Sequence, residues 1–350
     1  MKLKKTLLAA GLLAGFTITA VNTSSAHAET SSSDTVINER WGKPTFVMGA
    51  ALNSHQRAET MSILGIDNID SVNVEVATGE DLVKYLGYGS GQDSVMFSSV
   101  VVNREDKGKG ITVDIVTPEN ITLITADQYK NPLVTAGISD ATIKVGSVVK
   151  VTGESALTGV YKAFAANGEK VDPERAQLAQ EELDTTTDVA DSIVKNANQE
   201  NKTEQENLSD AEKEKADETY KTQLNQTLVD IKKELAELKE KQNELATKED
   251  VEKIVNDALA KNNLDKYITQ EDTQKLVSLA EKYQKIDGVL DEESIAQLDK
   301  ISSDFKDTVN DLTDQLGDFG NKLKGTLEDN QGFFANLWQS IKDFFAGLFN

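Results

Sequence analysis

The sequence contains no cysteine, only two histidines and only four prolines among its 350 residues. The absence of cysteine excludes disulfide bonds and thiol chemistry, so stability must come from ordinary packing. Zinc and iron sites normally take several imidazoles or thiolates, which this chain does not supply. The only arginines, Arg40, Arg57, Arg104 and Arg175, are scattered, and the formal net charge is -22. We therefore expect no metal, no other cofactor and no nucleic-acid partner.

The first 28 residues have the pattern of a secretory signal peptide. Three lysines at positions 2, 4 and 5 precede an apolar run over 7–21, and the small-x-small sequence Ala26-His27-Ala28 follows. A membrane anchor would need about 20 apolar residues. Cleavage would remove three lysines and no acid, which moves the formal net charge from -22 to -25. The pattern predicts an extracellular protein that can associate with the cell envelope, and a polar, flexible leader over 29–40.

Residues 41–183 alternate between strand and helix signals and predict a head domain with a mixed-sheet α/β sandwich. Strands are expected at 45–51, 72–76, 95–103, 111–116 and 141–151, and helices at 54–64, 78–86, 125–136 and from a cap at Thr152 or Ser155. Ser54 and Thr125 are expected to cap their helices, and Pro132 to kink or break the third helix. The sequence REDKGKG predicts a hairpin between the third and fourth strands. We expect this head to fold as an isolated fragment.

Several stretches of the head resemble a known family. They read VMGAALNSHQ, YLG, PLVTAGISDATIKV, VTGESALTGVYKAF and AQEEL, in this order. In these stretches, which cover about residues 41–190, the chain is similar to the YpuA-like family of secreted Gram-positive proteins of unknown function. The resemblance implies an exported, envelope-associated protein without a known activity, so it assigns no functional residues.

Beyond the head, the composition predicts an acidic linker over 184–220, because this stretch has almost no large apolar residues. Residues 221–330 predict a helical bundle or a coiled coil. Apolar residues spaced alternately by four and three form a seam, namely Leu224, Leu228, Ile231, Leu235, Leu238 and Leu245. This seam is short for a coiled coil, so packing against the chain's own later helices is an equal alternative. The predicted class is therefore α+β, with a sandwich followed by a linker and helices.

Three stretches have partial similarity to catalytic or ligand-binding motifs. Gly153-Glu154-Ser155 resembles a nucleophile elbow, but Leu157 stands where glycine is needed, and His55 would be the only base after cleavage. The glycine-rich stretch 87–91 follows a helix instead of a strand, which reverses the order of a dinucleotide site. Residues 285–293 lack the carboxylates of a calcium loop at the required positions. We therefore predict no catalytic, cofactor-binding or metal residues.

The last 20 residues, 331–350, predict an amphipathic aromatic helix. Phe334, Trp338, Ile341, Phe345 and Leu348 share one face. Half-burying this face and its flanking aromatic side chains would contribute roughly 10 kcal/mol, so it must meet an apolar surface. At about 25 Å the helix is too short to span a bilayer. Three destinations remain: the chain's own bundle or another copy, a membrane interface, or a groove on another protein.

The sequence as a whole predicts a secreted, non-catalytic envelope protein. Its C-terminal helix would serve self-association or docking on a membrane surface. The alternative is a secreted cell-wall hydrolase that uses carboxylates in the head, which the abundance of acids neither identifies nor excludes.

Overall fold

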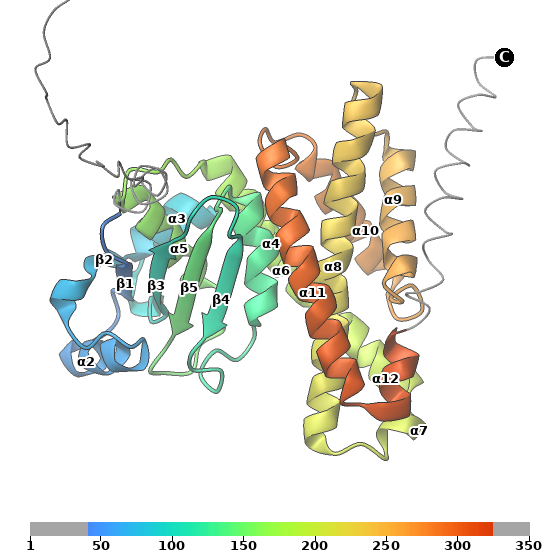
Figure 1. Cartoon of the computed structure of the whole chain (residues 1–350), viewed down its shortest axis with the longest axis horizontal. Coiled ribbons are helices and arrows are strands. Elements are labelled where there is room, and N and C mark those ends of the chain that lie inside the picture. Colours follow the sequence, from blue (N-terminus) through green and yellow to red (C-terminus); the bar gives the residue numbers. More distant parts are fainter. Residues whose placement is uncertain (1–40, 325–350) are drawn as a thin grey trace, which may run out of the picture.

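The computed structural model describes residues 41–324, which form a sheet-containing part and an all-helical part side by side (Figure 1). We call residues 41–183 the head and residues 184–324 the helical region. The helix α6 (Pro173–Glu200) runs from one into the other. The predicted α+β class is confirmed. The predicted signal peptide, leader and aromatic helix lie outside the described residues.

The head contains a five-stranded sheet in the order β2-β1-β3-β5-β4. The strands are β1 (Thr45–Gly49), β2 (Asn73–Ala77), β3 (Ser99–Arg104), β4 (Ile111–Ile115) and β5 (Ala141–Gly146). β1 is parallel to β2 and β4 is parallel to β5, whereas β3 is antiparallel to both β1 and β5. The predicted mixed sheet is therefore confirmed.

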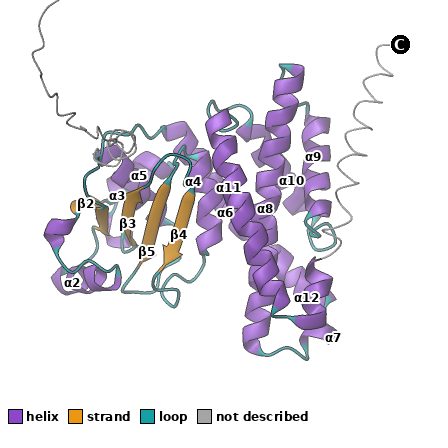
Figure 2. Ribbon diagram, in the orientation of Figure 1, coloured by secondary structure: helices purple, strands orange, loops and turns teal. Residues whose placement is uncertain are grey.

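The predicted hairpin between β3 and β4 is wrong, because β5 lies between these strands (Figure 2). The residues before β5 explain this order. The buried carboxylate of Asp140 accepts hydrogen bonds from the N–H groups of Gly108 and Gly110, at 3.0 and 2.9 Å. The Arg104 side chain donates to the carbonyl oxygens of Ser139 and Asp140. These bonds hold the start of β5 beside both ends of the connection between β3 and β4.

Four α-helices lie wholly within the head: α2 (Ser54–Ile63), α3 (Gly79–Leu86), α4 (Ala126–Thr135) and α5 (Ser155–Ala166). Two short 3-10 helices, η2 (Ile69–Ser71) and η3 (Asp93–Val95), precede β2 and β3. Thr125 caps α4 as predicted, and Gly137 follows that helix with a φ of 84°. α4 runs through Pro132 without ending there, so the predicted break is wrong.

Two other predicted caps are also wrong. Asn53, not Ser54, caps α2, because the Asn53 side chain accepts from the N–H groups of His55 and Gln56 while Ser54 is already helical. Glu154 precedes α5 without a capping side-chain bond. The predicted cap Thr152 instead donates its hydroxyl to the Glu154 carboxylate at 2.9 Å.

The helices of the head are unevenly distributed over the two faces of the sheet. α5 packs on β1, β2 and β3, α4 packs on β4, and α3 packs on α5 (Figure 1). This face holds the main core, with Val47, Val100 and Ile143 at 0–1% exposure. On the opposite face, α2 and the turn after it build a much smaller cluster around Phe46, Leu64 and Ile66.

The helical region continues from α6 through six further helices. They are α7 (Lys202–Gln205), α8 (Asp210–Gln242), α9 (Lys248–Lys261), α10 (Gln270–Tyr283), α11 (Glu292–Asp314) and α12 (Gly317–Lys324). Among residues 41–324, no helix is long and apolar enough to cross a membrane.

The predicted linker over 184–220 is wrong as a solvated segment. These residues complete α6, form α7 and begin α8. Ala190, Ala197, Ala216 and Thr219 in this stretch are 0–1% exposed. Small side chains let helices approach closely, so a helix can be buried without the large apolar residues whose absence suggested a linker.

The predicted seam belongs to α8, and the structure decides between its two interpretations. Leu224, Leu228, Ile231 and Leu235 are 0–1% exposed. α8 packs on the chain's own α6, α9, α10, α11 and α12. The seam therefore lies inside an intramolecular bundle, and Leu245, which the seam pattern also included, is exposed.

The main core does not stop at the boundary of the head. It includes Val229 of α8 and Ile301 and Phe305 of α11, each completely buried. α4 contacts α6, α8 and α11 as well as β4. The sequence predicts an independent head because the composition of the following residues indicates nothing for it to pack against. In the structure, α8 and α11 pack on it.

We expect residues 41–324 to unfold in one cooperative thermal transition, and the fragment 41–183 to melt at a lower temperature with a broader transition. The fragment lacks the side chains that cover α4, so it exposes apolar surface that the longer chain buries. Scanning calorimetry of both chains measures this. An equally sharp transition at the same temperature in the fragment would contradict the shared core.

Candidate functional site

A lysine and a glutamate are completely buried where the head meets the helical region. Lys232 Nζ on α8 lies 2.6 Å from Glu182 Oε1 on α6, and the two side chains are 1% and 0% exposed. Lys232 Nζ also donates to Thr135 Oγ1 at the end of α4, at 2.8 Å. The Thr135 hydroxyl in turn donates to Glu182 Oε2 at 2.5 Å. Three helices therefore meet at one closed polar triangle.

Burial and the neighbouring side chains determine the electrostatics of this triangle. Burial lowers the pKa of Lys232, and the adjacent Glu182 carboxylate opposes that shift. The ring of Tyr283 on α10 lies 4.7 Å from the ammonium and adds a cation–π contact. Because neither charged group reaches solvent, the pair cannot contact a substrate. A buried pair of this kind fixes the register of the elements that carry it more than it adds net stability.

A second contact between the head and the helical region is made by Arg175 in the first turn of α6. Its Nε donates to the carbonyl of Thr135 at 2.8 Å, and its Nη2 donates to the carbonyl of Val134 at 3.0 Å and to Ser294 Oγ at 3.1 Å. A guanidinium at the C-terminal end of α4 complements the partial negative charge of that helix end. Arg175 therefore joins α4, α6 and α11.

Glycine is required on one side of this arginine. Gly288 has a φ of 84°, and a Cβ at that position would lie 2.6 Å from Arg175 Nη1. A cavity of about 30 Å³ lies beside the guanidinium, lined by residues that include Asp291, Glu293 and Gln297. The Oε1 atom of Gln297 is buried and has no hydrogen-bond partner among the described residues. This volume has room for one or two water molecules.

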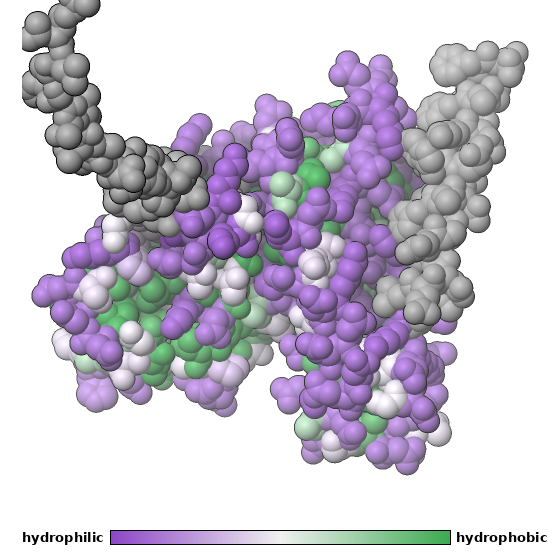
Figure 3. Space-filling view, in the orientation of Figure 1, coloured by the Kyte–Doolittle hydropathy of each residue, from purple (hydrophilic) through white to green (hydrophobic). Residues whose placement is uncertain are grey.

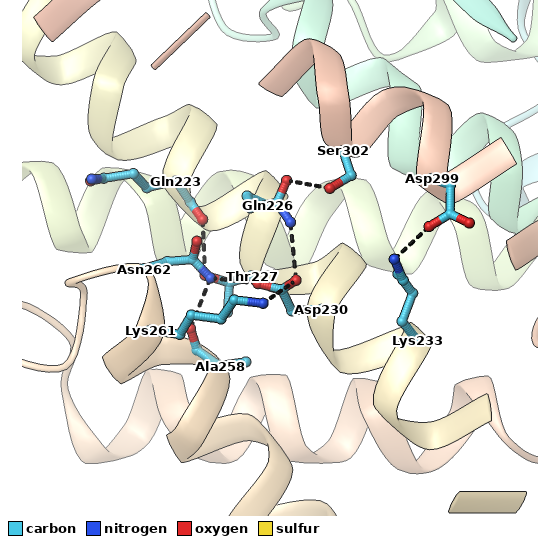
Figure 4. A network of polar contacts seen from close by, with 10 residues as sticks. All are labelled: Gln223, Gln226, Thr227, Asp230, Lys233, Ala258, Lys261, Asn262, Asp299 and Ser302. Atoms are coloured by element: carbon cyan, nitrogen blue, oxygen red, sulfur yellow. Dashed lines mark hydrogen bonds and ion pairs between the residues drawn. The ribbon is translucent and has the colours of Figure 1, made fainter. Parts of the chain in front are cut away.

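Figure 4 shows a third polar cluster, centred on Asp230 of α8. Asp230 Oδ1 accepts from Gln226 Nε2 at 3.0 Å and from Lys261 Nζ at 2.9 Å, and Oδ2 accepts from Asn262 Nδ2 at 2.9 Å. Gln226 Oε1 accepts from Ser302 Oγ at 3.1 Å. The network connects α8 to the end of α9 and to α11. Its charge-assisted bonds place these three helices relative to each other.

Two carboxyl groups close to these contacts have raised pKa values. Burial raises the pKa of Glu234 from 4.5 to about 7, and the neighbouring Asp230 adds to the shift. Burial also raises the pKa of Asp184 from 3.8 to about 6, with a smaller contribution from Glu154. A pair of carboxyl groups with different pKa values is what glycoside hydrolysis uses. The hydrolase alternative names carboxylates in the head without choosing a pair, and it stays a prediction that these observations do not test.

The residues considered for a serine hydrolase lie on helices that cover opposite faces of the sheet. Ser155 begins α5, which packs on the main core. His55 belongs to α2, its side chain is 89% exposed, and its Nδ1 lies 3.9 Å from Glu59 on the same helix. The structure therefore does not bring this serine and this histidine together.

The other two motif-like stretches have structural roles. Gly87, Gly89 and Gly91 all have positive φ values, as expected for a connection between α3 and η3. In the stretch 285–293, Gly288 makes room for Arg175, and Asp291 caps α11 by accepting from the N–H of Ser294 at 2.8 Å. The predicted apolar face of Phe334, Trp338, Ile341, Phe345 and Leu348 lies outside the described residues.

Sequence reasoning missed Lys232, Glu182 and Arg175. One signal was available for Arg175, because a basic residue in the first turn of a helix opposes the helix dipole unless another group holds it. No comparable signal marks Lys232 and Glu182, which are 50 residues apart in the chain and are surrounded by many other lysines and acids.

The exposed large apolar side chains are unevenly distributed between the two regions. Among the described residues they are Ile69, Val74, Val83, Tyr88, Val95 and Leu245. Only Leu245 belongs to the helical region. The unpartnered apolar surface of the described chain therefore lies mainly on the head.

We expect Lys232→Met to destabilise the protein by about 3–5 kcal/mol, because it leaves the Glu182 carboxylate buried without its partner. Adding Glu182→Gln should recover part of that loss. The control is Lys233→Met, which removes an exposed pair with Asp299 and should cost less than about 1 kcal/mol. Urea unfolding followed by circular dichroism measures all three variants. Equal costs for the two lysine substitutions would show that the buried pair has no special role.

The raised pKa values of Glu234 and Asp184 predict that stability falls as the pH rises. Each group contributes stability that is fully present below its ordinary pKa and is lost as the pH passes about 7 and about 6, respectively. We expect Glu234→Gln to flatten the decline of the melting temperature between pH 5 and pH 8. Glu240→Gln, at an exposed position of the same helix, is the control. An unchanged slope in Glu234→Gln would contradict the raised pKa.

Comparison with known proteins places this architecture in a family. The family model described as "Protein of unknown function (DUF1002)" matches residues 48–301. The chain is also 32% identical over 159 residues to "Uncharacterized protein YpuA" of Bacillus subtilis (strain 168), which covers 43% of this chain and 52% of that protein. The chain thus spans about half the length of this curated relative, and no solved structure matches it. The resemblance found in the sequence is confirmed, and the chain belongs to the DUF1002 family of proteins of unknown function.

Proposed function

We propose that this is an exported, non-catalytic protein of the cell envelope whose C-terminal segment, residues 331–350, docks on an apolar surface. The surface is either a membrane or another copy of the chain. The proposal starts from the export pattern in residues 1–28 and from the predicted face of Phe334, Trp338, Ile341, Phe345 and Leu348.

The distribution of exposed apolar side chains carries the proposal. One of the predicted destinations for this face was the chain's own helical bundle. In the described part of that bundle, Leu245 is the one large apolar side chain among the exposed ones. The described helical region therefore exposes few large apolar side chains, which favours a destination outside it.

The chemistry of the described residues supports a binding role over a catalytic one. Lys232 and Glu182, the most closely paired charges in the interior, are at most 1% exposed and serve the contact between helices. The cavity beside Arg175 has room for water and not for a substrate, because small-molecule pockets usually measure about 300–1,000 Å³.

The test follows Trp338 by fluorescence in the chain 29–350 and in a matched chain that ends at residue 330. Trp41 is buried and donates to Glu169 at 2.9 Å, so it should contribute equally to both spectra and cancel in their difference. We expect the difference spectrum to be blue-shifted either with neutral vesicles or at high protein concentration. The segment has one lysine and one acid, so the shift should be insensitive to salt.

A Trp338 spectrum typical of water, unchanged by vesicles and by protein concentration, would overturn the proposal. A blue-shifted spectrum that is the same at every protein concentration and without vesicles would also overturn it. That result would place the segment on its own chain.

A further inference from the structure

One face of the sheet is apolar on three strands, and α2 with the turn after it covers this face only in part. Val74 of β2 pairs with Phe46 of β1, and Phe46 pairs with Val101 of β3, so these three side chains point to the same side. Val76 and Met48 form the next pair on this side. We call these five residues the open-face strip. Figure 3 shows apolar residues gathered on the sheet surface in this view.

The open-face strip is accessible in part. Val74 is 40% exposed, and Val76, Met48 and Val101 are half-buried, whereas Phe46 is covered by the small cluster beneath α2. On the neighbouring strands the same face becomes polar, because Lys144 of β5 pairs with Val101 and Asp114 of β4 pairs with Lys144. The apolar area is therefore a band along β2, β1 and β3 with a polar border.

The dimensions of this band fit one helix. Strands lie about 4.8 Å apart, so three strands span about 10 Å, which is close to the diameter of an α-helix. The pairing supports the same reading, because parallel pairs such as β1 and β2 are normally covered on both faces. α5 covers the other face, whereas on the strip the end of α2 and the following turn cover Phe46 and leave Val74 40% exposed.

We propose that the open-face strip receives residues 333–349 of a second copy of this chain, so that two copies exchange their C-terminal helices. This inference rests on the proposed function, because it requires the segment to dock on an apolar surface. The segment contains Lys342 and Asp343 and has no net charge, so it brings no additional repulsion to a chain with a formal net charge of -22.

The position of α12 favours a second copy over the same copy. α12 packs on α8 and α11, at the end of the molecule opposite to β2 (Figure 1). The eight residues 325–332 span at most about 28 Å even when fully extended, and β5, β4, α4 and α8 lie between α12 and the strip (Figure 1). In a dimer with a two-fold axis, each segment docks on the strip of the other copy. Neither segment then has to reach across its own molecule, and both strips are covered.

The first experiment measures the molar mass of the chain 29–350 by sedimentation equilibrium over a wide concentration range. The parent should be a dimer. Val74→Asp should weaken the dimer by about tenfold or more, because it places a carboxylate beneath the docked helix. The matched control is Leu245→Asp, at a position that is 46% exposed in the helical region, and it should leave the dimer unchanged.

The second experiment mixes two variants at a concentration at which neither dimerises alone. A Val74→Asp chain keeps its C-terminal segment, and a Phe345→Asp chain keeps its strip. In an exchanged dimer the intact segment of the first chain can still dock on the intact strip of the second, so the mixture should form a one-to-one complex. This complex would also show that both variants are folded. Association of two strips or of two segments predicts no complex in the mixture.

The outcomes separate this inference from the proposed function. If Val74→Asp dimerises as tightly as the parent, or if the parent is monomeric while vesicles shift the emission of Trp338, the exchanged dimer is wrong and the proposed function stands. If Trp338 remains in water under every condition, both are wrong.

Discussion

The buried pair of Lys232 and Glu182 is the interaction on which the joint between head and helical region depends. Removing either charge alone would leave the other in a medium that cannot solvate it, so the two residues are needed together and they fix how α6 and α8 pack. Thr135 brings α4 into the same arrangement, because its hydroxyl bonds to both charged groups. The head and the helical region are therefore joined at one point by three helices.

The two regions bury their side chains by different means. The head encloses large branched and aromatic residues on one side of its sheet. The helical region buries leucines and tyrosines together with alanines and threonines at helix contacts, and it also has polar networks such as the one around Asp230. Among the described residues of this region, Leu245 is the one large apolar side chain that is exposed. The head keeps one sheet face that α2 covers only in part, and this is the face on which the docking segment is proposed to pack.

The family match covers the joint between the head and the helical region but not the docking segment. It covers residues 48–301, which include Val74, Glu182 and Lys232, whereas the segment 331–350 falls outside the matched range. The joint and four of the five strip residues therefore lie in the matched range, with Phe46 just before it, and the docking segment is argued from the chemistry of this chain. The matched range thus contains most of the described fold, whereas the exchange of C-terminal helices is a proposal about this protein alone.

The sequence by itself determined the features that depend on near neighbours. The five strands and the cap of α4 were readable because alternation and the bond between Thr125 and Gln128 involve residues a few positions apart. The tertiary structure alone decided that β5 separates β3 from β4, that 184–220 is packed, and that Lys232 meets Glu182 across 50 residues of chain. These features depend on contacts between segments that are distant in the chain. The local sequence around a lysine or an alanine does not identify the distant residue that it contacts, and only the tertiary fold determines it.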